Sequence, residues 1–186
     1  MALPLRNEEY YTYADYHALN EKGRWELIDG VAYMMAPPLR VHQSISGELF
    51  RQLSNFLYGK SCKVYAAPIG VRLNASTTDD TVLQPDIVVV CDHSKLEDNG
   101  INGAPDMVVE ILSPSSALHD TLTKFQLYQQ AGVREYWIVN PDTKTVGSHI
   151  LESGRYYVTN YGETSAIPVH ILEDCVITLQ DVFADA

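Results

Sequence analysis

Residues 107–114 read Met-Val-Val-Glu-Ile-Leu-Ser-Pro, and this segment decides the predicted fold. The run of apolar and β-branched residues, bounded by Pro105 and Pro114, is typical of a strand. A strand this apolar is expected to be covered on both faces. Glu110 lies in the middle of the run, where an ionised carboxylate is costly to bury without a cation or several hydrogen-bond donors. The segment therefore predicts a metal ion or a fixed basic partner beside Glu110.

A second acid occupies a comparable position upstream. Asp86 opens another apolar strand, in the segment Gln-Pro-Asp-Ile-Val-Val-Val at 84–90. Carboxylate oxygens are typical ligands of Mg²⁺, which also retains bound waters. Such an ion can polarise a phosphoryl oxygen and lower the pKa of a bound water. The two acids thus favour a site for a hard divalent cation and hydrolysis of a phosphodiester.

A helix is predicted to follow, with Ser115 or Ser116 as its N-cap and an end near Ala131. Steps of about 100° per residue direct Lys124 toward protein more than toward water. Lys124 would then orient or deprotonate an attacking water, or stabilise negative charge in the transition state. The alternative is an ion pair with Asp120 at i,i+4, worth only a few tenths of a kcal/mol. The same steps predict that four further side chains lie away from the solvent stripe: Leu118, Leu122, Phe125 and Tyr128.

Two residues nearer the N-terminus complete the set of candidates. Glu26 follows Trp25 in a predicted strand, and by itself it reads as a surface acid. His42 lies in the first turn of a predicted helix, where the macrodipole disfavours the protonated imidazole. A neutral His42 could accept a proton or fix a water, and a histidine that simply hydrogen-bonds at a helix start remains an equal alternative.

The remaining pattern is that of a mixed α/β chain. A capping box at 12–15 predicts a short helix, an Asp-Gly turn at 29–30 joins two strands, and apolar residues from Val41 to Leu57 recur at helical spacing. Short strands are predicted near 63–66, 69–73 and 135–140, followed by a meander of strands and a terminal turn at 179–184. The Asp-, Asn- and Gly-rich segment 92–104 is predicted to be a loop.

Length and composition set further limits. The chain has 186 residues, enough for one domain spanning 1–186 with a full core. We expect a cytoplasmic protein with no membrane segment, because no apolar run reaches the length of a span and the N-terminus lacks the order of a signal peptide. Three scattered cysteines (Cys62, Cys91 and Cys175) indicate neither disulfides nor structural zinc. The net charge of −11 argues against simple nucleic-acid binding, unless the acids surround bound cations, basic residues concentrate on one face or oligomerisation assembles a groove.

Taken together, these motifs resemble the Uma-two endonuclease family, which is widespread in bacteria and expanded in cyanobacteria. The resemblance rests on the segments at 26–30, 84–86, 109–115 and 132–139, on the Pro-Pro before His42, and on Asp120, Lys124 and Tyr128. The family belongs to the PD-(D/E)xK restriction-endonuclease-like superfamily. Membership implies a three-layer α/β fold in which a mixed central sheet is flanked by helices.

The resemblance also implies roles for individual residues. Asp86 and Glu110 would bind Mg²⁺ or Mn²⁺ with the backbone carbonyl of Ile111, and Glu26 matches an acid that many members place before the Pro-Asp strand. The chain departs from the pattern at Leu112, where the superfamily has lysine, so the lysine role would have migrated to Lys124. The implied activity is endonucleolytic cleavage of nucleic acid, DNA first, and a homodimer is expected for a two-strand cut.

Two other interpretations stay open at this stage. The chain could be a catalytically silent module that keeps the fold for binding or assembly, as its acidic charge and the missing Glu-x-Lys would suggest. Alternatively, Asp86 and Glu110 could merely pair with Arg or Lys in the core. An Arg guanidinium between the two acids would favour that last reading.

Overall fold

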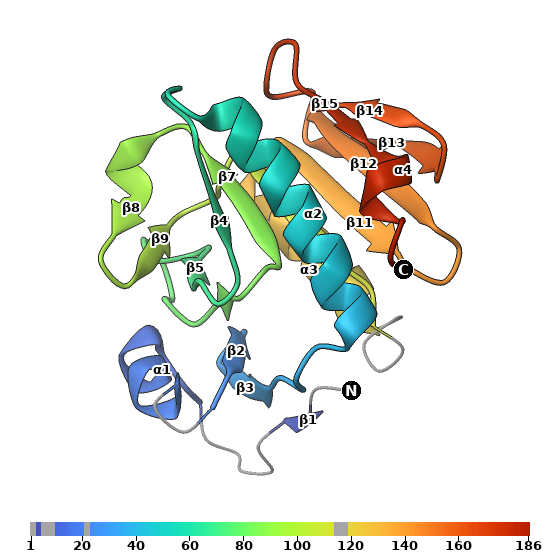
Figure 1. Ribbon diagram of the computed structural model, residues 1–186. Coiled ribbons are helices and arrows are strands. Elements are labelled where there is room, and N and C mark those ends of the chain that lie inside the picture. The colour runs from blue at the N-terminus through green and yellow to red at the C-terminus, as the bar shows by residue number, and fades with distance from the viewer. Residues whose placement is uncertain (1–2, 5–9, 21–22, 114–118) are drawn as a thin grey trace.

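The computed structural model describes residues 3–4, 10–20, 23–113 and 119–186 (Figure 1). Its helices are α1 (Tyr13–Asn20), α2 (Arg40–Leu57), α3 (His119–Ala131) and α4 (Leu179–Val182), with a 3₁₀ turn η1 (His93–Lys95). Its strands are β1 (Leu3–Pro4), β2 (Trp25–Ile28), β3 (Val31–Met34), β4 (Lys63–Ala66), β5 (Val71–Arg72), β6 (Val82–Leu83), β7 (Ile87–Val90), β8 (Leu96–Glu97), β9 (Gly100–Asn102), β10 (Met107–Ile111), β11 (Glu135–Asn140), β12 (Thr145–Glu152), β13 (Arg155–Gly162), β14 (Ala166–Pro168) and β15 (Val176–Thr178).

The segment that decided the prediction is the centre of a six-stranded mixed sheet. The strand order is β13-β12-β11-β10-β7-β4. β10 pairs parallel with β11, placing Glu110 opposite Ile138, and antiparallel with β7, placing Val109 opposite Ile87. Over Met107–Val109, β10 therefore has a paired strand on each side, and its backbone groups are satisfied inside the sheet.

Helices cover both faces of this sheet, which gives the expected three layers. Alternate residues of a strand point to opposite faces. Val109 and Val89 pack with the apolar side of α2, whereas Val108 and Val88 pack with Tyr128 of α3. In Figure 1, α2 crosses the near face of the sheet and α3 lies behind it. The predicted restriction-endonuclease-like architecture, with a mixed sheet flanked by helices, is confirmed.

A second sheet brings Glu26 to the same region. Its order is β1-β3-β2-β6-β5-β9-β8, seven strands in all. β2 and β3 form the predicted hairpin, with Asp29 and Gly30 both at positive φ (48° and 78°) as a type I′ turn requires. β2 also pairs with β6, just before Gln84 and Asp86. The two sheets are thus joined by the chain next to the candidate acids.

Three expectations about individual segments were wrong. Segment 92–104 is not a loop throughout, because it contains η1, β8 and β9, and β9 pairs parallel with β5. Leu122 is 65% exposed, since it lies on the same side of α3 as the exposed Gln126 and Gln130. Helix positions four apart share a face, so Leu122 belongs to the solvent stripe.

The third correction concerns the cysteines. Cys62 and Cys91 form a disulfide. β4 and β7 pair antiparallel with Lys63 opposite Val90, and this register brings the residues just beyond each strand end face to face. Cys175 is a buried free thiol, as expected of a small buried residue. Among the residues that the structure describes, no helix is long and apolar enough to span a bilayer.

Candidate active site

Asp86 is fixed at the start of β7 by the strand beside it. The amide of Ile111 donates a hydrogen bond to Oδ2 of Asp86 at 2.7 Å. The N–H and C=O groups of one residue in a strand point to the same side. The carbonyl of Ile111 is therefore directed to the same side as Asp86, as its proposed role in metal binding requires.

Glu110 is held by two donors on α3. Tyr128 donates its hydroxyl proton to Oε1 of Glu110 at 2.8 Å, and Lys124 Nζ lies 3.2 Å from the same oxygen. Burial raises the pKa of Glu110 to about 7, and the charges of Asp86 and Glu26 add to the rise. Lys124 and the Tyr128 hydroxyl oppose it. The carboxylate therefore lies where a cation would strongly favour its ionised form.

Lys124 joins Glu110 to Glu26. Its Nζ lies 2.8 Å from Oε1 of Glu26, which also accepts a hydrogen bond from the amide of Gln84 at 2.9 Å. Lys124 is 8% exposed and Glu26 is 5% exposed. Burial by itself lowers the pKa of Lys124, but the charges of Glu110 and Glu26 outweigh it and raise the pKa well above its ordinary value. Lys124 points into the protein, as the helical steps predicted, and Glu26 is not a surface acid.

His42 contacts the other acid. Its Nε2 lies 3.2 Å from Oδ2 of Asp86. Burial lowers the pKa of His42, but the hydrogen bond and charge of Asp86, the charge of Glu110 and a contact with the Ile111 backbone raise it overall. These contacts thus favour protonation of the imidazole, whereas the macrodipole at the start of the helix disfavours it. Nδ1 is buried without a hydrogen-bond partner among the described residues.

The donor atoms suit a hard cation. Asp86 and Glu110 each use one oxygen in the contacts above, and their second oxygens, Oδ1 and Oε2, accept no hydrogen bond from a described residue. With the Ile111 carbonyl they supply oxygen ligands of the kind Mg²⁺ and Mn²⁺ prefer. Across the described part of the chain, no three His, Cys, Asp or Glu side chains converge to hold an ion by themselves. An ion held by two carboxylates and one carbonyl would take its remaining ligands from water.

The structure also shows what the sequence did not assign. Tyr128 was named for its buried helix face and for the family resemblance, but no role toward Glu110 was given to its hydroxyl, although its spacing of one turn from Lys124 was a usable signal. The support that Gln84 gives Glu26 depends on the pairing of β2 with β6, which no local pattern reveals. The proposed Asp120–Lys124 ion pair, the N-cap at Ser115 or Ser116, and Leu118 lie outside the residues whose side chains are described.

The three-layer fold, with acids on neighbouring strands and a buried lysine on the next helix, defines the class as restriction-endonuclease-like. A crystal structure described as "a putative nuclease belonging to DUF820", from Anabaena variabilis, superposes with a TM-score of 0.72 at 19% identity, covering 88% of this chain and 91% of that one. Residues 8–180 match the family model Uma2, "Putative restriction endonuclease". The chain belongs to the Uma2 family, which confirms the resemblance drawn from the sequence.

A cyanobacterial relative is similar over most of its length. The "Uncharacterized protein slr1290" of Synechocystis sp. is 27% identical over 159 residues, which cover 84% of this chain and 80% of that protein.

Proposed function

We propose that the protein is a metal-dependent endonuclease that hydrolyses phosphodiester bonds of nucleic acid, with DNA as the first candidate substrate. The observation that carries this proposal is the position of Lys124, buried between Glu26 and Glu110. Membership of the Uma2 family and the description of the structural neighbour as a nuclease support it.

Asp86, Glu110 and the carbonyl of Ile111 would hold Mg²⁺, and Mn²⁺ could replace it. The ion, when bound, supplies Lewis-acid stabilisation of a phosphoryl oxygen and a more acidic water. The ion would also lessen the repulsion between this acidic protein, with its net charge of −11, and a nucleic acid. A phosphate would meet a cation at the site instead of bare carboxylates.

Lys124 would act as a charged donor and not as a base. The sequence left open whether this lysine deprotonates a water, orients it or stabilises charge. The two carboxylates that raise its pKa disfavour the neutral amine that a general base must be. A fixed ammonium group can instead orient a water or stabilise the extra negative charge of the transition state. Glu26 would position Lys124, and His42 would position Asp86.

A homodimer belongs to the same proposal, because two copies of one site most simply cut two strands.

The test is cleavage of single- and double-stranded DNA and RNA in Mg²⁺, Mn²⁺ or EDTA. We expect cutting that requires a metal and falls by at least about a hundredfold in Glu110→Gln and Lys124→Met, as for removal of one group that stabilises the transition state. Lys63→Met is the matched control, because Lys63 is an exposed lysine of β4. Cleavage in EDTA, or cleavage that persists in both site variants, would contradict the proposal. Metal binding without cleavage would favour the silent-module alternative.

A further inference from the structure

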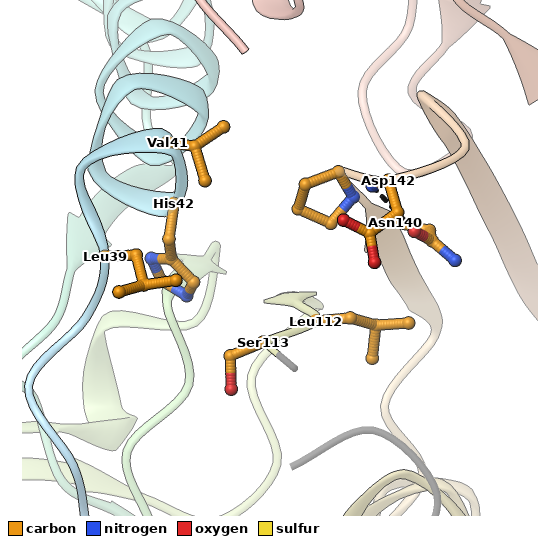
Figure 2. Close-up of a pocket in the computed structure, with 8 residues that line it drawn as sticks. Leu39, Val41, His42, Leu112, Ser113, Asn140 and Asp142 are labelled. Carbon is orange, nitrogen blue, oxygen red and sulfur yellow. Dashed lines mark hydrogen bonds between the residues drawn. The ribbon is translucent and has the colours of Figure 1, made fainter. Parts of the chain in front are cut away.

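A pocket opens beside the candidate site, between the start of α2 and the carboxyl ends of β10 and β11. Its volume is about 140 Å³. Figure 2 shows Leu39 and His42 on one side, Asn140 and Asp142 on the other, and Leu112 and Ser113 between them. Val41 and Pro141 complete the lining.

The pocket adjoins the proposed metal site at His42. His42 lines the pocket and also contacts Asp86. Leu112 follows the proposed ligand Ile111, and it stands where the superfamily pattern has lysine. In this chain that position supplies an apolar wall instead of a charge. A nucleotide whose phosphodiester lay at Asp86 and Glu110 would therefore have this pocket beside it.

Size and lining indicate what the pocket can hold. A cavity of about 150 Å³ with apolar walls binds benzene, so about 140 Å³ suits one six-membered aromatic ring. Leu39, Val41, Leu112 and Pro141 give apolar surface for the faces of such a ring. The exposed Asp142 carboxylate disfavours a phosphate here and favours a ligand that donates an N–H.

We propose that this pocket takes an unpaired pyrimidine base, cytosine by preference, next to the phosphodiester that is cut. A carboxylate accepts a hydrogen bond from the N4 amino group of cytosine, whereas thymine and uracil present the O4 acceptor at that position. A base can enter a pocket of this kind only when it leaves its stack, so single-stranded or locally opened nucleic acid is the substrate class. This inference rests on the proposed function.

The test uses free nucleosides, which need neither metal nor cleavage. ¹H–¹⁵N spectra of the full chain in EDTA are titrated with cytidine, uridine and adenosine. We expect shifts confined to the amides of residues 39–42, 112, 113, 140 and 142. Cytidine should bind about tenfold more tightly than uridine, the factor expected of one further hydrogen bond to a charged group.

Two variants and one control sharpen the test. Asp142→Asn should remove the preference for cytidine, because an amide can donate to O4 as well as accept, while Leu39→Ala should weaken cytidine and uridine alike. Asp98→Asn makes the same change of charge at an exposed residue outside the pocket and should change nothing. Equal affinities for the three nucleosides, no shifts at all, or a preference that survives Asp142→Asn would overturn the inference. Failure of the proposed function would appear separately, as absence of metal-dependent cleavage.

Discussion

Lys124 Nζ lies 2.8 Å from Oε1 of Glu26, and this contact joins a helix on one sheet to a strand of the other. Both residues are buried, and Glu110 makes the second ion pair of the lysine at 3.2 Å. One ammonium group thus serves two carboxylates. Two carboxylates and one ammonium group carry a net negative charge. A metal ion bound nearby would offset that charge.

Replacing Lys124 by methionine should destabilise the protein as well as stop cleavage. The change leaves two buried carboxylates without their cation, and breaking a buried pair typically costs about 3–5 kcal/mol. Chemical denaturation measures the loss. The double variant Lys124→Met/Glu26→Gln removes one of the stranded charges and should recover part of the stability without any cleavage activity. A double variant as unstable as the single one would show that Glu26 and Lys124 are not coupled.

Tyr128→Phe should lower the affinity for metal while costing the fold little stability. The variant removes the hydroxyl that donates to Oε1 of Glu110 but keeps the buried ring against Tyr136, whose centroid lies 5.0 Å away. Loss of a residue that orients a metal ligand typically lowers affinity about 10- to 100-fold. Calorimetric titration with Mn²⁺ measures this effect. Tyr156→Phe, which removes a hydroxyl bonded to the Val133 carbonyl, is the control and should leave Mn²⁺ affinity unchanged.

Glu135 predicts a dependence of stability on pH. Burial raises its pKa above the ordinary 4.5, although it accepts hydrogen bonds from Trp137 Nε1 and the Ile171 amide. Its contribution to stability is present below the unfolded-state pKa and is lost as pH rises through the folded-state pKa. As pH rises from about 4.5, the native chain should therefore lose stability that Glu135→Gln keeps. The free energy of unfolding of the variant should increase relative to that of the native chain, by about 1.4 kcal/mol for each unit by which folding raises the pKa of Glu135.

The exposed Glu152 supplies the control for this pH effect. Denaturation of the native chain, Glu135→Gln and Glu152→Gln at a series of pH values separates the contribution of Glu135 from a constant offset. If the free energies of unfolding of the native chain and Glu135→Gln differ by the same amount at every pH, the raised pKa of Glu135 is contradicted.

Substitution of two glycines by alanine should change stability in opposite directions. A Cβ at Gly100 would lie 2.4 Å from the backbone oxygen of Gly70, and the φ of +147° already disfavours a side chain. Gly100→Ala should therefore cost about 1–3 kcal/mol, as overpacking does. Gly47 is exposed in α2, and outside the backbone of its own helix no atom of the described residues lies within 4 Å of its Cβ position, so Gly47→Ala should stabilise the chain by about 0.5–1 kcal/mol. Thermal unfolding of both variants measures the contrast.

Local patterns in the sequence were enough to predict the strand around Glu110, the Asp-Gly hairpin and the long helix after Pro38. Each of these depends on residues that are near one another in the chain. The burial of Lys124 was also predictable, because helical periodicity alone sets its direction. Local patterns could not predict the disulfide, the strands within 92–104 or the burial of Glu26. Each of these depends on which distant strands pair. Leu122 shows a further limit, because a residue at the edge of a helical stripe can fall on either side of it.

The bridge from Lys124 to both glutamates has a consequence for the order of folding. Glu26 belongs to a hairpin near the N-terminus, whereas Lys124 and Glu110 come from much later in the chain. Contacts between distant segments form late, because closing the intervening chain costs entropy before the contact is gained. Neither sheet by itself can assemble the ion-pair cluster, so recovery of metal affinity during refolding should lag behind recovery of secondary structure.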